Sequence, residues 1–307
     1  MALGTAHFGG ERASWAVWFD QAQAVFRHAL TRGITFFDSG STYGGGDAER
    51  YLGTMIRDNA RRQDVVVTTK VFFPTGEGAN ARGLSRHHIR QAVDESLKRL
   101  GTDYIDVLMI HRWDATTPIE ETLSALDDVV RSGRALYLGA SSMSAWRFMK
   151  ALGLQRSNGL APFVCMQNLH NLLYREEERE MNPLCDEEGI GRVPWSPLAR
   201  GLLCGPGIDP LREKDDRLLR DRSDAELDGP VLDALDQIVT ATGSPHAAIA
   251  LAWLYTKGIV APAVGPSSPA QLDTALQALE LVLSAEHVSQ LEASYRPHII
   301  MGHQSNG

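Results

Sequence analysis

The sequence predicts an α/β protein of the (β/α)8 class, the fold also called a TIM barrel. Short apolar runs recur along the chain, and segments with helical periodicity separate them. The runs lack the alternation of half-exposed strands, which is typical of parallel strands covered on both faces. An open doubly wound sheet would normally carry a GxGxxG loop after its first strand, and none occurs here. The predicted strands are Met1–Thr5, Ile34–Phe37, Val65–Thr68, Ile105–Ile110, Ala135–Leu138, Phe163–Met166, Arg192–Trp195 and Ile259–Val264.

Helices are predicted between these runs from period and capping residues. Gln21–Thr31 follows Asp20 as an N-cap and precedes Gly33, a residue suited to a helix end. Pro118–Arg131 opens with Thr117 as cap and proline at its first position. Two more predicted helices are His88–Leu100 and Pro245–Lys257.

The overall composition predicts one domain over residues 1–307, because no linker, low-complexity tract or charge run divides the chain. The net charge of −8 argues against nucleic-acid or membrane partners. No apolar run reaches the roughly 18 residues that span a bilayer, and no signal-peptide pattern opens the chain. Three widely spaced cysteines predict reduced thiols and a cytoplasmic protein, while the oligomeric state stays undetermined.

Four ionisable side chains stand where predicted strands end. Asp38 follows the second strand, Tyr43 lies five residues further on, Lys70 follows the third strand and His111 follows the fourth. Neighbouring parallel strands lie about 4.8 Å apart, so these groups converge on one end of the barrel. Each alone has an ordinary structural interpretation: a cap, an aromatic lid, a surface lysine or a hydrogen-bonded histidine. Together they indicate a catalytic site.

This set of groups suits proton transfer to a carbonyl oxygen. A phenol loses its proton at about pH 10, and a neighbouring ammonium makes it a stronger acid. Lys70 could act on Tyr43 in this way, with Asp38 pairing and fixing Lys70. His111 could hydrogen-bond the substrate oxygen. Tyr43 would then be the general acid in reduction, and its phenolate the base in oxidation.

The chain resembles the aldo-keto reductase superfamily over nearly its whole length, and the order of its short motifs carries this resemblance. The forms at 141–143 and 195–197 are most similar to the aryl-alcohol dehydrogenase-like branch of bacteria and fungi. The motifs are Gly4-Thr5, Phe36-Phe37-Asp38, Tyr43-Gly44, Thr69-Lys70, 101–106 (GTDYID), 111–114 (HRWD), 138–142 (LGASS), 166–168 (MQN) and 195–201 (WSPLARG).

The resemblance implies a catalytic tetrad of Asp38, Tyr43, Lys70 and His111. It also implies a nicotinamide cofactor, NADP(H) by family default, whose ring would stack on Trp195. Thr5 and Asp38 would lie near the nicotinamide ribose, and Ser141, Ser142 and Gln167 would hold the carboxamide. The pyrophosphate would meet Ser196, Pro197, Leu198 and Gly201, and the adenosine end would meet Gly265, Ser267, Ser268 and Gln271.

The chain departs from its relatives in two places. Relatives normally begin with a β-hairpin that covers the barrel bottom, whereas Met1 falls almost on the first strand. We therefore expect that hairpin to be absent and apolar bottom residues to meet water. Relatives also often carry Lys or Arg in the adenosine segment, where these cations bind the 2′-phosphate of NADPH. Here Ser267, Ser268 and Gln271 offer hydrogen bonds without charge, so NAD(H) use stays open.

The substrate pocket is predicted on the loops after the first five strands. Its apolar character suits aryl or alkyl aldehydes and ketones better than highly charged compounds. One alternative function is a non-catalytic cofactor-binding subunit, which could keep the tetrad yet turn over slowly. Another is a metal-dependent hydrolase, but only His111 is well placed as a ligand, so no metal is expected. The pocket candidates are Phe8, Tyr43, Phe72, His111, Trp113, Met143 and Trp146.

Overall fold

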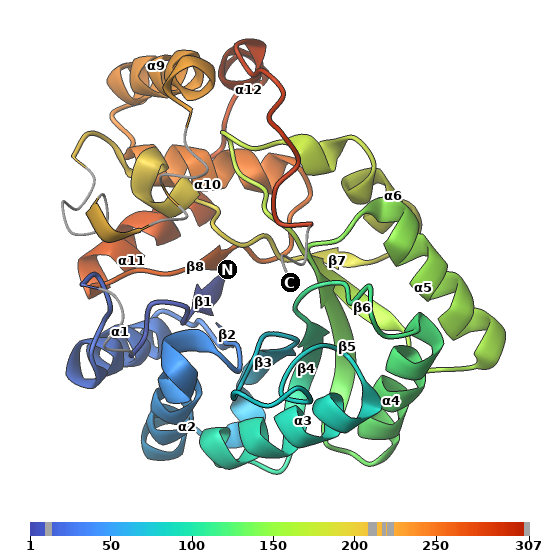
Figure 1. The fold of residues 1–307 in the computed structure, drawn as a ribbon. Helices are drawn as coiled ribbons and strands as arrows, with labels where there is room; N and C mark the ends of the chain where they lie inside the picture. The colour runs from blue at the N-terminus through green and yellow to red at the C-terminus, as the bar shows by residue number, and fades with distance from the viewer. Residues whose placement is uncertain (10–13, 208–213, 217–218, 220–223, 304–307) are drawn as a thin grey trace.

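The computed structural model describes residues 1–9, 14–207, 214–216, 219 and 224–303. They form the predicted (β/α)8 barrel, with eight parallel strands in the order β7-β6-β5-β4-β3-β2-β1-β8 and helices around them (Figure 1). Residues near β7 and β8 close the ring: Trp195 bridges to Ala263 in parallel, and the Ala263 amide donates to the Pro194 carbonyl at 3.0 Å. The strands are β1 (Ala2–Gly4), β2 (Phe36–Asp38), β3 (Val66–Val71), β4 (Ile105–Ile110), β5 (Ala135–Ser141), β6 (Phe163–Gln167), β7 (Gly191–Arg192) and β8 (Ala263–Val264).

The helices cover the outside of the barrel because one face of each is apolar. In α4, for example, Leu123, Leu126 and Val129 are buried. The acidic Glu120 and Glu121 lie in its first turn, where their negative charges interact favourably with the helix dipole. The helices are α1 (Phe19–Thr31), α2 (Asp47–Asn59), α3 (Arg86–Leu100), α4 (Ile119–Arg131), α5 (Ala145–Asn158), α6 (Met181–Glu187), α9 (Ala225–Thr242), α10 (His246–Thr256), α11 (Pro269–Leu276) and α12 (Ala285–Ala293).

Two predicted caps are wrong. Helix α1 begins at Phe19 with Trp18 as its N-cap, so Asp20 lies inside the first turn, where its charge meets the free amides. Helix α4 begins at Ile119 with Pro118 as N-cap. The Thr117 hydroxyl donates instead to the carboxylate of Asp114, at 2.8 Å.

Alternate strands fill the barrel interior. Phe36 of β2, Met109 of β4 and Cys165 of β6 form a small cluster with Val193, separate from the larger core between strands and helices. Such layering by alternate strands is the ordinary filling of an eight-stranded barrel. The interior between the strands is therefore packed with side chains.

Apolar side chains at the opposite end of the barrel meet solvent. Each belongs to the beginning of a strand or lies just before one. They are Val66 (38% exposed), Leu136 (46%), Tyr137 (55%), Val164 (37%) and Val260 (65%).

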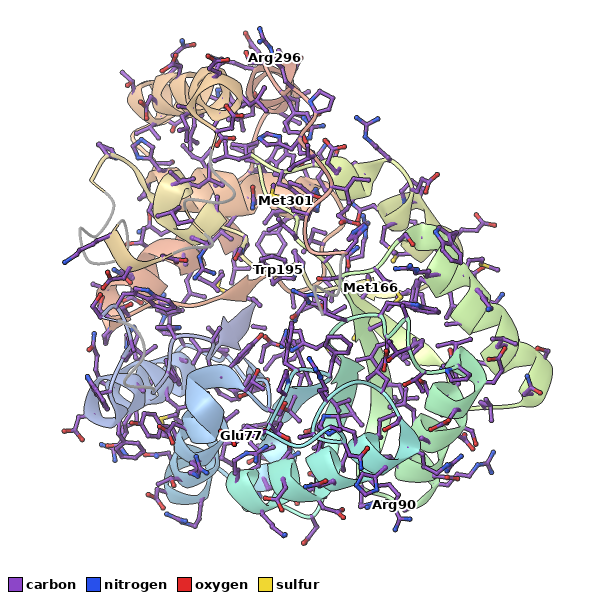
Figure 2. The ribbon with its side chains drawn as sticks, viewed as in Figure 1. Glu77, Arg90, Met166, Trp195, Arg296 and Met301 are labelled. Atoms are coloured by element: carbon purple, nitrogen blue, oxygen red, sulfur yellow. The ribbon has the colours of Figure 1, made fainter. Side chains whose placement is uncertain are left out.

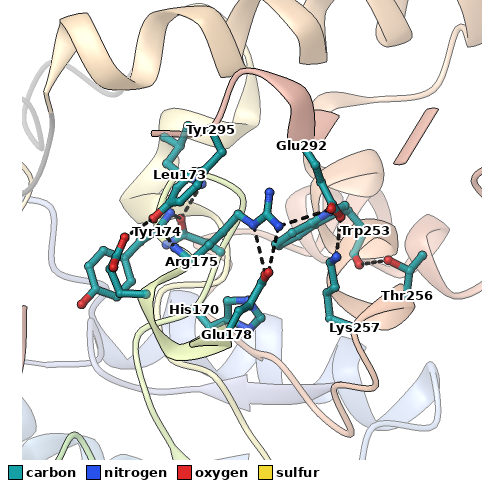
Figure 3. Close-up of polar contacts among 12 residues, drawn as sticks. His170, Leu173, Tyr174, Arg175, Glu178, Trp253, Thr256, Lys257, Glu292 and Tyr295 are labelled. Atoms are coloured by element: carbon teal, nitrogen blue, oxygen red, sulfur yellow. Dashed lines mark hydrogen bonds and ion pairs between the residues drawn. The ribbon is translucent and has the colours of Figure 1, made fainter. Parts of the chain in front are cut away.

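A charged cluster fastens the last helices to the loop after β6 (Figure 3). The guanidinium of Arg175 donates to Glu178 at 2.8 Å and lies 3.3 Å from the carboxylate of Glu292 in α12. Glu292 also accepts from Trp253 Nε1 of α10 at 2.8 Å. This cluster anchors α12, and the chain that follows α12 reaches Trp195 at the C-terminal ends of the strands.

Candidate active site

The four predicted catalytic residues come together at the C-terminal ends of β2, β3 and β4. Asp38 ends β2 and Lys70 is the last residue but one of β3. His111 follows β4, and Tyr43 opens a short 3-10 turn, η1 (Tyr43–Gly46), after β2. The side chains of Asp38, Lys70 and His111 are buried, and Tyr43 is half-buried. Gly40 leaves room for the Tyr43 ring, because a Cβ at this glycine would stand 3.1 Å from Cζ of the ring and push it aside by a few tenths of an ångström.

Lys70 is held as a buried cation. Its Nζ donates to both carboxylate oxygens of Asp38, at 2.8 and 2.9 Å, and to the Ser39 carbonyl at 2.7 Å. The same Nζ lies 5.1 Å from the centroid of the Tyr43 ring. Burial lowers the pKa of Lys70, but Asp38 and Tyr43 raise it by more, so the net direction is upward. The ammonium therefore keeps its proton beside the phenol.

His111 faces Tyr43 as a neutral ring. The two ring centroids lie 5.8 Å apart at 78°, and the Phe73 ring packs edge-on against His111 at 4.7 Å. Burial, followed by the charges of Lys70 and Arg112, holds the pKa of His111 well below its ordinary value. A neutral imidazole keeps one N–H donor, which can bind a carbonyl oxygen without adding a charge.

The predicted carboxamide-binding residues stand next to the tetrad. Ser141 Oγ donates to the Gln167 carbonyl at 2.7 Å, and Trp195 Nε1 donates to Ser142 Oγ at 3.0 Å. Gln167 Nε2 donates to Asp38 Oδ1 at 3.0 Å. Thr5 also joins this group, since its hydroxyl donates to the Asp38 carbonyl at 3.1 Å. The ends of five strands thus meet in one polar network.

Strained backbone marks the same segments. Among the described residues, four that are not glycine have positive φ, and all fall within the stretches that the resemblance assigns to the nicotinamide and pyrophosphate. The left-handed conformation costs roughly 1–2 kcal/mol for a residue with a Cβ, and such strain gathers at functional sites. These residues are Ser142 (φ 47), Ser196 (50), Ala199 (46) and Arg200 (57).

The segment after Trp195 turns sharply beside the strand ends. Pro197 and Leu198 lead into the 3-10 segment η4 (Ala199–Cys204), and the Gly201 amide donates to the Leu198 carbonyl at 2.9 Å. Gly201 has φ 111, a backbone conformation that favours glycine.

The predicted adenosine segment caps α11. Ser268 Oγ accepts the Gln271 amide at 3.3 Å, and Gln271 Oε1 accepts the Ser267 amide at 2.7 Å. Gly265 lies against His7, whose Nδ1 would stand 3.0 Å from an added Cβ. This corner offers hydroxyl, amide and imidazole groups around the start of a helix.

The side chains predicted to contact the substrate differ in how far they are buried. Phe8, Trp113 and Met143 are buried in the main core, and Tyr43 and Phe72 pack against that core. Trp146 is 62% exposed on the first turn of α5. Phe73, which the sequence analysis passed over, is the phenylalanine that touches His111. Nothing in the sequence distinguishes Phe72 from its neighbour Phe73 as the phenylalanine that contacts His111.

The C-terminal segment also reaches the site, and sequence reasoning missed it. A Cβ at Gly302 would lie 3.4 Å from Cζ2 of Trp195, and Figure 2 shows Met301 and Trp195 near the centre of the barrel end. His303 Nε2 lies 2.7 Å from Glu177, and Glu177 accepts from Asn168 Nδ2 at 2.5 Å. Asn168 in turn accepts the Ser142 amide at 2.8 Å. Asn168 could have been suspected from the 166–168 motif; the contacts of the tail had no local signal.

Among the described residues, no group of three or more His, Cys, Asp or Glu side chains is arranged to hold a metal ion. Within the same part of the chain, no helix is both long enough and apolar enough to cross a membrane.

Comparison with known proteins shows the family. The aldo/keto reductase family model matches residues 1–296. A versiconal hemiacetal acetate reductase of Aspergillus parasiticus is 38% identical over 323 positions, covering 97% of this chain and 94% of the relative. A Schizosaccharomyces pombe protein named as an aryl-alcohol dehydrogenase is 38% identical over 322 positions, covering 95% and 91%.

The chain therefore belongs to the aldo-keto reductase family, a family of oxidoreductases that generally use nicotinamide cofactors. Within the family it groups with the aryl-alcohol dehydrogenase-like branch, as the motifs at 141–143 and 195–197 predicted.

Proposed function

We propose that this protein reduces aldehydes or ketones to alcohols, with Tyr43 as general acid and NADPH as the usual hydride donor. The observation that carries the proposal is the buried ammonium of Lys70. It is fixed by Asp38 and the Ser39 carbonyl and lies 5.1 Å from the centre of the Tyr43 ring. A phenol beside a fixed cation, next to a neutral imidazole, suits proton delivery to a carbonyl oxygen.

Each residue then has one task. His111 donates a hydrogen bond to the substrate oxygen and orients it. Tyr43 gives its proton to that oxygen, and Lys70 stabilises the phenolate left behind. In the reverse direction the Tyr43 phenolate takes the proton from the alcohol. The bound nicotinamide supplies or accepts the hydride.

The residues present fit a nicotinamide cofactor. Trp195 offers an aromatic face, the Ser141, Ser142 and Gln167 side chains stand beside it, and the strained turn at 196–201 presents backbone to a pyrophosphate. The segment 265–274 contains no lysine or arginine, so the preference for NADPH over NADH should be weak. Fluorescence titration with both cofactors tests this, and a preference for NADPH above about thirtyfold, or about 2 kcal/mol, would contradict it.

We propose aryl or other apolar carbonyl compounds as substrates. The Phe73 ring against His111 supports an apolar contact surface for the substrate. The Arg112 guanidinium, 5.4 Å from the Phe73 ring centre and 6.0 Å from that of Trp195, is a charged group beside it. A panel of benzaldehydes, alkyl aldehydes, sugars and aldehyde acids tests the substrate class. Sugars or acids turned over far faster than benzaldehydes would overturn it. We further propose a cytoplasmic protein whose partners are small molecules, which the small number and wide spacing of its three cysteines support.

The decisive variant is Tyr43→Phe. It should lower kcat for aldehyde reduction by at least about a hundredfold while leaving the cofactor Kd within about twofold. A variant that keeps most of its activity would show that the acid is another group. The wild-type turnover number also separates this enzyme from a non-catalytic cofactor-binding subunit, which would bind the cofactor yet turn over very slowly.

A further inference from the structure

The carboxylate of Asp38 receives more donors than its pairing with Lys70 requires. Its Oδ1 accepts Lys70 Nζ at 2.8 Å, Thr68 Oγ1 at 2.6 Å and Gln167 Nε2 at 3.0 Å. Its Oδ2 accepts Lys70 again at 2.9 Å. An ionised carboxylate is an acceptor only, so each of these partners must be the donor. Gln167 belongs to the proposed carboxamide site, which leaves Thr68 as the donor with no other assigned role.

Thr68 stands beside Asp38 by register. The two residues are direct partners in the β2–β3 ladder, and the Ser39 amide donates to the Thr68 carbonyl at 2.9 Å. The Thr68 side chain is fully buried. A valine has nearly the same shape and would avoid burying a hydroxyl, which is costly without a partner. The hydroxyl is satisfied here by the carboxylate that anchors Lys70.

Thr69, the next residue of β3, hydrogen-bonds to a different carboxylate. Thr69 lies on the opposite face of β3, where its hydroxyl donates to Glu49 of α2 at 2.5 Å. Glu49 is paired there with Arg99 of α3 at 2.6 Å. Two adjacent threonines thus serve separate carboxylates, one inside the barrel and one between strand and helices. This gives a matched control on a single strand.

We propose that Thr68 is a positioning residue for the reduction, acting through Asp38. Its hydroxyl fixes the Asp38 carboxylate and withdraws part of the negative charge from Oδ1. The Asp38 carboxylate then cancels less of the Lys70 charge, and more of that positive field reaches the Tyr43 hydroxyl. Without the Thr68 hydroxyl, Lys70 and Asp38 neutralise each other more fully, and Tyr43 becomes a weaker acid. This inference rests on the proposed function.

The test compares Thr68→Val, Thr68→Ser and the control Thr69→Val. In Thr68→Val we expect kcat to fall roughly tenfold, the size typical of losing a hydrogen bond to a charged group. KM and the cofactor Kd should stay within about twofold, since neither reports on proton transfer. The pH at which activity is half lost on the alkaline side should rise. Thr68→Ser should restore both kcat and the pH profile, and Thr69→Val should lower Tm without moving the profile.

A second measurement needs neither cofactor nor substrate. Tyrosine ionisation is followed by ultraviolet absorbance, and the signal of Tyr43 is taken as the difference from a matching protein that carries Tyr43→Phe. The pH at the midpoint of this Tyr43 absorbance change should be higher in Thr68→Val than in the wild type. In Thr68→Ser it should be close to the wild-type value. If the wild type reduces no carbonyl compound, the proposed function fails, but this titration still decides the role of Thr68.

Two results would overturn the inference. One is a Thr68→Val protein whose pH profile and tyrosine titration match the wild type. The other is Thr68→Ser being as impaired as Thr68→Val, which would mean that shape matters and the hydroxyl does not. Should Thr68→Val fail to fold, Thr68→Ala and Thr68→Ser form the pair to compare, and equal kcat values in these two would also reject the proposal.

Discussion

The ammonium of Lys70 lies 2.8 Å from one oxygen of Asp38 and 2.9 Å from the other, with both side chains buried at the catalytic end of the barrel. A buried charge that loses its partner is strongly destabilising, whereas removing both partners often costs little. The pair is therefore a structural unit as well as a chemical one, and the two roles can be separated by mutation.

Lys70→Met should lower the free energy of unfolding by about 3 kcal/mol, because the buried Asp38 charge loses its cation. This is the low end of the usual range, since the carboxylate keeps the hydrogen bonds from Thr68 and Gln167. The double variant with Asp38→Asn should recover much of this stability but none of the activity, since no cation remains beside Tyr43. Urea unfolding and aldehyde reduction measure the two effects. A single variant as stable as the wild type would show that solvent or another group compensates the carboxylate.

Acid should weaken the cluster that fastens α12. Burial raises the pKa of Glu178, but its hydrogen bonds to His170 and Arg175 lower it by more, to about 2. The folded pKa thus lies below the ordinary 4.5. The contribution to stability is complete above about pH 4.5 and is lost as the pH falls toward 2, amounting to about 2 kcal/mol after allowing for solvent. Thermal melts from pH 6 to 2 should show a steeper fall for the wild type than for Glu178→Gln.

Alkali should loosen the C-terminal segment. The hydrogen bond from His298 to Asp228, at 3.1 Å, raises the pKa of His298, although burial lowers it. Because the folded pKa lies above 6.5, the stabilisation is complete below that pH and is lost as the pH rises through the folded value. Hydrogen-exchange protection of residues 295–303 should therefore fall between pH 6 and 9. In His298→Asn, whose amide donates without titrating, protection should not depend on pH in this way.

The strained turn after Trp195 should tolerate glycine but not valine. Ala199 has φ 46, a conformation that is rare for any residue with a Cβ and rarest for β-branched ones. Ala199→Gly should change the free energy of unfolding by less than about 1 kcal/mol, since relief of strain offsets the added freedom of the unfolded chain. Ala199→Val should cost about 1–2 kcal/mol. Equal Tm values for the two variants would argue that the turn relaxes freely.

The sequence predicted the barrel, and the meeting of Asp38, Tyr43, Lys70 and His111 at one end of it, because both depend on local patterns. Short apolar runs locate all eight strands, and Asp38, Lys70 and His111 each follow such a run. Strand ends were less accurate. The strand predicted at 192–195 is the shorter β7 at 191–192 in the structure, and the strand predicted at 259–264 is the shorter β8 at 263–264. Pro194 and Pro262 lack the amide hydrogen that a longer ladder would use.

Contacts between distant segments could not be predicted in this way. Gln167 reaches Asp38 across 129 residues, and His303 reaches Glu177 across 126. Neither pairing leaves a periodicity or motif, because a hydrogen bond between side chains depends on how strands neighbour each other in three dimensions. The order of the strands around the barrel supplies this information.

The contact between Gly302 and Trp195 has a practical consequence for handling the protein. A tag or fusion partner joined directly to residue 303, in place of the last four residues, starts one residue from Gly302 and near the indole ring, where it would compete for space with a cofactor at the proposed site. Tags placed before β1 start at the far end of the barrel. Purification with an N-terminal tag should thus spare the kinetics that a C-terminal tag would distort.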